Sequence, residues 1–307
     1  MRKTVHIAVF LLAFLAIAAQ GQDTFMVMSV KGKVESTSSR SKTWKKVSVG
    51  IVLGDNDIIR TSFASYVKIM VNGARLVSID ENTSKPLKEF GTKKKAGTEQ
   101  QSPTGSLLQY AAEQFSKNKS RKGGSDFGAV RGGMEIFSAV FPKSNILTPT
   151  PSFQWVDSDS GSAYDVMVVD ENFTTIGRAK VSGKSITLDT TNLKLQDGKT
   201  YHWRVSRIKD GESSDIQSFH IMQHDTVTAI REEVSRLNSD LLGMGADEIT
   251  IHLIKAVYYE KKALYCDAFN EYKETIRLAP DVEEYRDMMR SLLMNLRLYN
   301  EEEFLLR

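Results

Sequence analysis

The sequence predicts a multidomain α+β protein in which two antiparallel β modules are followed by an all-α helical tail. In residues 22–90 and 134–222, short runs of β-branched and aromatic residues alternate with turn-forming dipeptides, a pattern typical of antiparallel sheets. After Asp225 the apolar residues recur about every 3.6 positions, which is the period of an amphipathic helix. This change of period marks the predicted boundary between sheet and helix.

The first residues are typical of a secretory signal peptide. Arg2 and Lys3 precede an almost unbroken apolar run at residues 7–19, and the small residue Gly21 follows it. This run is shorter than the roughly 20 apolar residues that a helix needs to span a bilayer. We therefore expect a signal peptide at residues 1–21, with an uncleaved anchor as the alternative, and no transmembrane segment after cleavage.

The cysteine content bears on the compartment. Cys266 is the single cysteine of the chain, so no internal disulfide can form. Eukaryotic secreted proteins of this size usually carry several disulfides. We therefore expect an exported protein, in the periplasm or on the cell surface of a two-membrane bacterium.

The formal net charge of +3 hides an uneven distribution. Residues 23–131 contain 19 Lys and Arg against 10 Asp and Glu, a net charge of +9, whereas residues 223–307 contain 11 against 17, a net charge of −6. A basic front is suited to an anionic glycan, a lipid headgroup or nucleic acid. A solvated surface plus a basic linker is the favoured explanation, and nucleic acid is not an expected partner because an aromatic-basic binding platform is missing.

The first β module, residues 22–90, contains a clear hairpin signal. Apolar residues alternate with other residues along residues 66–71, as in a strand with one face buried. Asn72-Gly73 then supplies the positive φ angles of a two-residue turn, and residues 74–79 form the expected partner strand.

The order of signals in this module is similar to that of a known domain. The run G-I-V-L-G-D-N-D-I-I-R-T begins at Gly50 and is followed by a strand, the N-G hairpin and D-E-N-T, which ends at Thr83. This order resembles the FecR-type extracytoplasmic domain, over residues 25–87. The resemblance implies a β-rich module of the kind found in envelope signalling and surface proteins, and it implies no reaction.

Residues 91–133 are expected to form a basic flexible linker. The stretch contains Lys93-Lys94-Lys95 and several Gly, Gln and Pro residues, which cannot build a core. Within it, four apolar residues share one face of a short helix predicted at residues 106–117.

The central module, residues 134–222, is predicted to be an antiparallel sandwich. Its short strands are separated by turns such as Asp197-Gly198. The order F-x-W, Y-x-V-x-V, Y-x-W-R-V and F-x-I resembles a fibronectin type III or related immunoglobulin-like domain. Trp155 and Trp203 are predicted core aromatics, and stacking on a carbohydrate is the less favoured alternative.

The helical tail, residues 223–307, shows four helical segments. The first has an apolar stripe that repeats at spacings of three and four residues, with Asp225 as its predicted N-cap. Helices are expected at residues 225–243, 247–262, 266–278 and 280–298.

The middle pair of these helices resembles one tetratricopeptide repeat. Ala256, Tyr259, Ala268, Tyr272 and Pro280 match the small, aromatic and terminating positions of that repeat. The resemblance implies a protein-binding groove.

Two residues depart from the repeat pattern: His252 stands in place of a Trp and Lys255 in place of a Leu. One repeat is also fewer than the three or so that a solenoid needs. A plain four-helix bundle is therefore an equal alternative.

The sequence offers no catalytic, cofactor-binding or metal-binding constellation. Asp55 and Asp57 could act as a pair of carboxylates, but in this context they are expected to shape a turn. Cys266 is a poor nucleophile candidate, because the adjacent Asp267 raises the pKa of its thiol.

Three further patterns come close to known sites and miss them. Gly183-Lys184-Ser185 resembles the end of a phosphate-binding loop, but a strand is predicted where a helix is required. Residues 157–161 resemble a calcium loop with its glycine one position early. His220 and His224 have a spacing that suits metal ligands on a helix, but His220 falls in a predicted strand.

These observations favour an exported, non-catalytic binding or scaffolding protein of the bacterial cell envelope. The expected partner is another envelope protein bound by the helical tail, with a glycan or peptidoglycan second. A periplasmic FecR-like sensor or regulator is the alternative, although only six residues precede the apolar run, which leaves no cytoplasmic helical segment. A glycan-acting enzyme ranks last.

Overall fold

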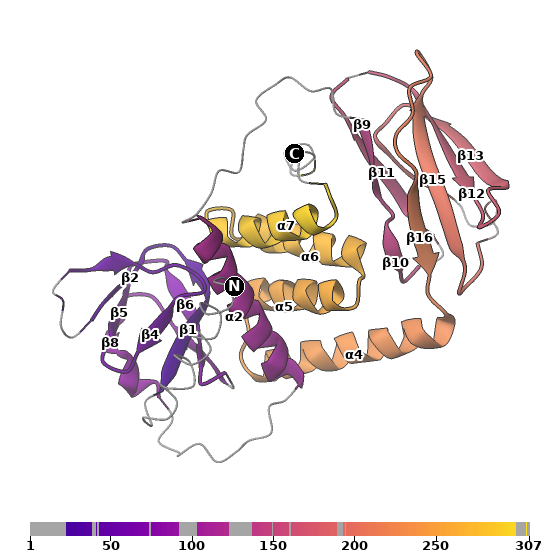
Figure 1. The fold of residues 1–307 in the computed structure, drawn as a ribbon. Coiled ribbons are helices and arrows are strands. Elements are labelled where there is room, and N and C mark those ends of the chain that lie inside the picture. The colour runs from indigo at the N-terminus through magenta and orange to yellow at the C-terminus, as the bar shows by residue number, and fades with distance from the viewer. Residues whose placement is uncertain are drawn as a thin grey trace, which may run out of the picture. The chain divides into compact units, whose positions relative to one another are not determined.

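The computed structural model belongs to the α+β class, with sheets in the N-terminal and central parts of the chain and helices in the C-terminal part (Figure 1). At this level the predicted fold class is confirmed. The residues that the structure describes are 23–38, 41, 43–73, 75–91, 103–122, 137–148, 150–159, 161–188, 193, 195–298 and 305. The predicted signal peptide lies outside them, as do the parts of the predicted linker on either side of its helix.

The chain divides into two compact units. The first consists of Met1–Gly123, Leu237–Ile254 and Thr275–Arg286, and the second of Gly124–Arg236, Lys255–Glu274 and Asp287–Arg307. The first unit therefore contains the N-terminal β module, the second contains the central one, and each C-terminal helix contributes residues to both.

The N-terminal module consists of two four-stranded antiparallel sheets, ordered β4-β1-β6-β7 and β3-β2-β5-β8. A short 3-10 helix, η1 (Leu87–Glu89), follows them. The strands are β1 (Thr24–Lys31), β2 (Val34–Thr37), β3 (Lys45–Lys46), β4 (Val52–Gly54), β5 (Ile58–Thr61), β6 (Tyr66–Val71), β7 (Arg75–Ile79) and β8 (Ser84–Pro86).

The predicted hairpin is confirmed. Strands β6 and β7 pair in antiparallel register from Val67 with Ile79 to Val71 with Arg75. The φ angles of Asn72 and Gly73 are 54° and 72°, as a turn of this type requires.

Helix α2 (Pro103–Lys122) is longer than the helix predicted at residues 106–117. Pro103 is its first residue, a position where the missing backbone N–H of proline costs nothing, so the proline does not disrupt the helix. Its residue Phe115 packs on Gly50, where φ is +78° and an added Cβ would lie 2.3 Å from the Phe115 Cβ. Glycine at position 50 thus permits both the backbone conformation and the close approach of the helix.

Within the first unit, hydrogen bonds join the β module to C-terminal helical residues. Ser29 Oγ on β1 donates to Asp247 Oδ2 at 2.7 Å, and the buried Tyr285 hydroxyl donates to the Met28 carbonyl at 3.3 Å. Burial and the neighbouring Asp247 raise the pKa of Tyr66 to about 12. Asp247 therefore links strand β1 to the helical residues of the first unit.

The central module is built from a five-stranded sheet, ordered β10-β16-β15-β12-β13, and a three-stranded sheet, ordered β14-β11-β9. All pairs are antiparallel except β10 with β16, which is parallel. The strands are β9 (Phe137–Phe141), β10 (Ser144–Ile146), β11 (Ser152–Asp157), β12 (Tyr164–Val169), β13 (Thr175–Val181), β14 (Ser185–Thr187), β15 (Thr200–Arg207) and β16 (Gln217–Ile221).

One apolar core lies between these two sheets. It includes Phe153 and Trp155 from the smaller sheet and Trp203 and Phe219 from the larger. The rings of Phe153 and Trp203 meet edge to face, with centroids 5.1 Å apart, and Trp203 Nε1 donates to the Pro142 carbonyl at 2.9 Å. The prediction that both tryptophans are core aromatics is confirmed.

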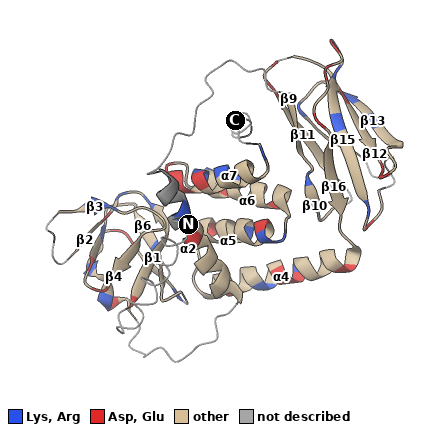
Figure 2. Cartoon of the chain, in the orientation of Figure 1, with Lys and Arg blue, Asp and Glu red and all other residues tan. Residues whose placement is uncertain are grey.

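The C-terminal region consists of α4 (His224–Gly243), α5 (Glu248–Lys261), α6 (Tyr265–Leu278) and α7 (Glu283–Asn295), close to the four predicted segments. Helix α4 begins at His224, so Asp225 lies in its first turn and is not its N-cap. Both signs of charge occur along these helices (Figure 2). None of the helices in the described ranges is long and apolar enough to cross a membrane.

Candidate functional site

The outer face of the five-stranded sheet is the strongest candidate for a functional site. Side chains on a strand alternate between two faces, and Val166 and Val168 of β12 belong to the core. Met167, between them, therefore points outward. It is paired with Arg178 on β13 and with Arg204 on β15, so the register places an apolar side chain between two guanidinium groups.

A groove of about 220 Å³ lies on this face. Its walls include the exposed side chains of Phe173 and Ile216, which are 63% and 52% exposed. The Phe173 ring stacks on His202, with ring centroids 4.9 Å apart and an interplanar angle of 7°. Burial of the remaining exposed surface of Phe173 and Ile216 would stabilise a complex by about 1–2 kcal/mol for each side chain. The groove lining consists of Met167, Val169, Phe173, Thr175, Trp203, Arg204 and Ile216.

The turn between β12 and β13 holds Phe173 in its exposed position. Phe173 has a φ angle of 61°, a left-handed conformation that costs a non-glycine residue about 1–2 kcal/mol. Asp170 fixes the turn, because its Oδ1 accepts hydrogen bonds from the backbone N–H groups of Asn172 and Thr174, both at 2.9 Å. The aromatic ring is thus presented to solvent by a well-defined turn.

The two arginines of this face differ in their partners. Arg178 Nε lies 2.8 Å from Asp165 Oδ1 and 2.7 Å from Oδ2, and this contact lowers the pKa of Asp165 despite partial burial. Arg204 makes no hydrogen bond or ion pair among the residues that the structure describes, but it lies close enough to the Asp165 carboxylate to help lower the pKa of that group, as does Lys180. Three cations, Arg178, Lys180 and Arg204, therefore surround one carboxylate, and these four side chains carry a net positive charge.

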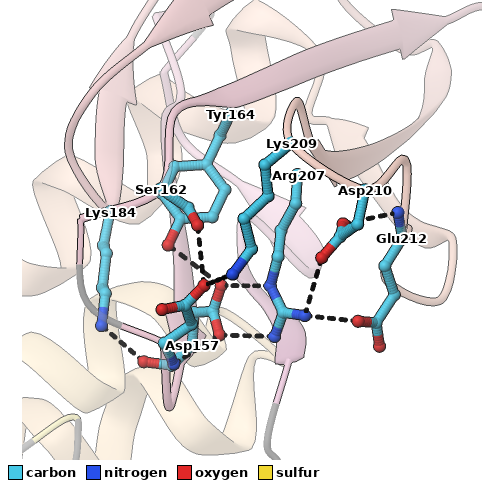
Figure 3. A network of polar contacts seen from close by, with 9 residues as sticks. Asp157, Ser162, Tyr164, Lys184, Arg207, Lys209, Asp210 and Glu212 are labelled. Carbon is cyan, nitrogen blue, oxygen red and sulfur yellow. Dashed lines mark hydrogen bonds and ion pairs between the residues drawn. The ribbon is translucent and has the colours of Figure 1, made fainter.

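A second polar cluster lies at one end of the same module (Figure 3). Its centre is a buried ion pair: Arg207 Nε and Nη2 lie 2.7 Å from Asp157 Oδ2 and Oδ1, and the side chains are 3% and 0% exposed. The Tyr164 hydroxyl also donates to Asp157 Oδ2, at 3.0 Å. Burial disfavours ionisation of Asp157, but hydrogen bonds from Arg207, the Asp159 backbone and Tyr164 outweigh it and lower the pKa of this carboxyl.

Charged residues around this pair extend the cluster. Arg207 also contacts Glu212 and lies 3.7 Å from Asp210 (Figure 3). Lys209 pairs with Asp159. Because the charges are matched by protein partners, we interpret the cluster as a clamp between β11 and β15 and the loops that follow them.

This clamp explains two of the near-matches in the sequence. In the calcium-like stretch, the carboxylates of Asp157 and Asp159 are engaged by Arg207 and Lys209. In the phosphate-loop-like stretch, Lys184 donates to the Asp157 carbonyl and Ser185 begins strand β14. The predicted strand after Lys184 is confirmed.

Asp57 shapes the turn between β4 and β5, as predicted, because its Oδ2 accepts from the Gly54 backbone N–H at 2.9 Å. Asp55 lies in the same turn, but its Oδ2 accepts from the N–H of Asp23, 32 positions away, at 3.3 Å. Burial raises the pKa of Asp55, whose Oδ1 is buried and has no hydrogen-bond partner among the described residues.

The remaining candidates lie in or next to the helical region. Burial, reinforced by Asp267, raises the pKa of Cys266 to about 12, which makes the thiol a weak nucleophile at neutral pH. His220 lies on β16 and His224 begins α4, so they do not share a helix. The described part of the chain contains no cluster of three or more His, Cys, Asp or Glu that could hold a metal.

The tetratricopeptide-like positions of the second unit are packed. Ala256 and Ala268 are buried, and the buried Tyr272 donates from its hydroxyl to Glu260 Oε2 at 2.9 Å. Lys255, a departure from the repeat pattern, has its Nζ 2.5 Å from Glu271 Oε1. An ion pair between α5 and α6 thus accommodates a lysine where the repeat has an apolar residue.

No local pattern in the sequence predicted the groove. Its members come from three strands, the β12–β13 turn and the segment directly before β16, and only the strand register brings Met167 beside Arg204. The signal available in the sequence was an aromatic residue, Phe173, directly after the predicted Asp170-Glu171-Asn172 turn.

Comparisons with known proteins leave the family of this chain open. No family model matches the chain, and no curated protein matches its sequence. Matching solved structures include CopC from Methylosinus trichosporium OB3b, at 13% identity and a TM-score of 0.23 over 29% of this chain and 96% of that one. The BSP domain of a biofilm-associated protein matches at 12% identity and a TM-score of 0.22, over 66% of this chain and 25% of that one.

A third matching structure contains the FN1–FN3 domains of chicken CNTN1. It matches at 13% identity and a TM-score of 0.21, over 66% of this chain and 57% of that one. The chain thus spans 25% and 57% of the length of the BSP and CNTN1 structures. At these TM-scores the likenesses carry no argument about function.

Proposed function

We propose that this chain is an exported, non-catalytic binding or scaffolding protein of the bacterial cell envelope, and that the central module holds a protein partner. The observation that supports this function is the groove on the five-stranded sheet. It combines an exposed aromatic ring, a second exposed apolar side chain and the guanidinium of Arg204, which makes no hydrogen bond among the described residues. Aromatic residues and arginine are the side chains that most often dominate binding energy at interfaces.

The proposed modules follow from the resemblances in the sequence. The N-terminal module is proposed to be FecR-like, and its two antiparallel sheets are compatible with this. The central module is proposed to be fibronectin type III or immunoglobulin-like, which its two facing sheets support. The α5–α6 pair is proposed to be a tetratricopeptide-like hairpin that offers a second contact for an envelope partner.

Photocrosslinking in the source cells tests this function. A benzophenone amino acid is placed at position 173 in the full chain and, as a matched control, at position 63 in another. Phe63 is 79% exposed and precedes Ala64, whose φ angle is 52°, so both probes occupy exposed turns. We expect one defined protein adduct at position 173 that is lost with Ile216→Ser and absent at position 63.

The crosslinks also have an outcome that contradicts the proposal. Equal adducts at positions 173 and 63 would mean that the groove has no preferred partner. The absence of adducts at both positions would mean the same. The Ile216→Ser variant must unfold at the same temperature as the wild type. If it unfolds earlier, loss of the adduct would reflect a folding defect and not loss of the groove.

The second candidate, a periplasmic sensor, is favoured by the hydrogen bonds of the first unit. Because Ser29 and Met28 on β1 are bonded to Asp247 and Tyr285, a ligand on the β module has a direct route to helical residues. Mapping the N-terminus of the mature chain distinguishes the candidates: a membrane-held, uncleaved chain favours the sensor, and a cleaved one favours the binding protein.

A further inference from the structure

We infer that the groove on the five-stranded sheet recognises an acidic peptide segment of a partner protein, in which one apolar side chain lies next to an Asp or Glu. This inference rests on the proposed binding function and specifies the chemistry of the partner. It follows from the size of the groove, the composition of its lining and the charge beside it.

The size of the groove favours a single side chain as its occupant. Its volume of about 220 Å³ is below the roughly 300–1,000 Å³ of sites that enclose drug-sized ligands. One face is open to solvent, since Phe173 and Ile216 in its walls are largely exposed. A side chain that projects from an extended segment fills such a space while its backbone crosses the rim.

The lining favours a peptide over a sugar. Apart from Thr175 and Arg204, the side chains that line the open part are apolar: Met167, Val169, Phe173 and Ile216. The hydroxyl groups of a sugar would leave water for a surface that offers them few hydrogen bonds, which costs free energy. A leucine or phenylalanine side chain loses no hydrogen bonds there and gains contact with Phe173 and Met167.

The charge beside the groove sets the second requirement. Among the described residues Arg178 is hydrogen-bonded to Asp165, whereas Arg204 and Lys180 interact with the same carboxylate only electrostatically. One carboxylate cannot balance three cations, so the face keeps a net positive charge beside the groove. A carboxylate can accept two parallel hydrogen bonds from a guanidinium, and a positively charged rim attracts acidic partners over neutral ones. The occupant is therefore apolar and anionic at neighbouring positions.

The test uses a synthetic peptide array and the full-length chain without its predicted leader. Each probe is an acetylated, amidated nonapeptide of Gly and Ser that carries one Leu or Phe, with one Asp placed one to three residues away. A matched array replaces Asp by Asn, and oligogalacturonate serves as the acidic glycan probe. Affinities are measured for the wild type and for Arg204→Gln, Phe173→Ser, Lys180→Gln and Phe63→Ser.

We expect at least one Asp peptide to bind about tenfold or more tightly than its Asn counterpart, the size of effect that a charge-assisted hydrogen bond provides. Arg204→Gln should abolish this preference and retain weak apolar binding, whereas Phe173→Ser should abolish binding of both peptides. Lys180→Gln should reduce affinity less than twofold, and Phe63→Ser should leave it unchanged. Unfolding midpoints that match the wild type confirm that each variant is folded.

Three results would overturn the inference. The first is equal binding of the Asp and Asn peptides. The second is a preference for Asp peptides over Asn peptides that persists in Arg204→Gln. The third is binding of oligogalacturonate without binding of any peptide. None of them affects the crosslink at position 173. A defined adduct there together with an inactive peptide array would retain the binding function and reject only this partner chemistry.

Discussion

Removal of the Asp157 carboxylate should destabilise the central module by about 3–5 kcal/mol, because Asp157→Ala leaves the Arg207 guanidinium buried without its main partner. The pair is 0% and 3% exposed, and both of its hydrogen bonds measure 2.7 Å. Tyr164 loses the acceptor of its hydroxyl as well, which adds about 1 kcal/mol. Because Arg207 keeps its contacts with Glu212 and Asp210 in the variant, we expect the total loss of stability to lie toward the lower end of this range.

Denaturant unfolding, followed by the fluorescence of the core tryptophans, measures this effect. The double variant Asp157→Leu, Arg207→Met is the matched control, because replacing a whole buried pair by apolar residues is often neutral or stabilising. We expect the double variant to recover most of the stability lost in Asp157→Ala. A loss below about 1 kcal/mol in the single variant, or an equal loss in both, would refute the interpretation of this cluster as a buried clamp.

Three further predictions concern other parts of the chain. Gly50→Ala should destabilise the first unit by about 1–3 kcal/mol, because the new Cβ meets Phe115 at a position where φ is +78°, and a thermal melt unchanged from the wild type would contradict this. Asp247→Ala should cost about 1–2 kcal/mol, because the carboxylate accepts from Ser29 and from the first turn of α5, and accelerated hydrogen exchange at the start of α5 measures it. Burial raises the pKa of Asp267 to about 6. The stability that its protonated carboxyl contributes is therefore full below the unfolded pKa of about 3.9 and is lost as the pH rises through 6. Asp267→Asn should remove this decline in a pH series of denaturant midpoints, and an unaltered decline would exclude Asp267 as its source.

Local signals in the sequence predicted much of the secondary structure. The spacing of apolar residues located the helices from α4 to α7 within a few residues, and Asn72-Gly73 located a hairpin, because both features depend on neighbours in sequence. Helix α2 was predicted too short, since polar residues at its two ends resemble a linker, although Thr104 is buried and its Oγ1 donates to Asp240. Such a tertiary contact has no local signature.

The candidate site depends on contacts that the sequence does not show locally. Asp157 and Arg207 are 50 positions apart, and Arg204 meets Met167 only through the pairing of β12 with β15. Without the register, Trp203 was identifiable as a core residue, but its neighbour Arg204 could not be placed in a groove. The same limit applies to Lys255, whose partner Glu271 lies on the next helix.

The proposed function requires that this chain bind a partner without chemically changing it. Once the protein that crosslinks at position 173 has been identified and purified without crosslinks, calorimetry measures its binding, and mass spectrometry compares both proteins before and after mixing. We expect a saturable complex that Phe173→Ser weakens about tenfold or more and unchanged covalent masses for both proteins. A partner that leaves the mixture cleaved or modified, or one that binds Phe173→Ser as tightly as the wild type, would contradict it.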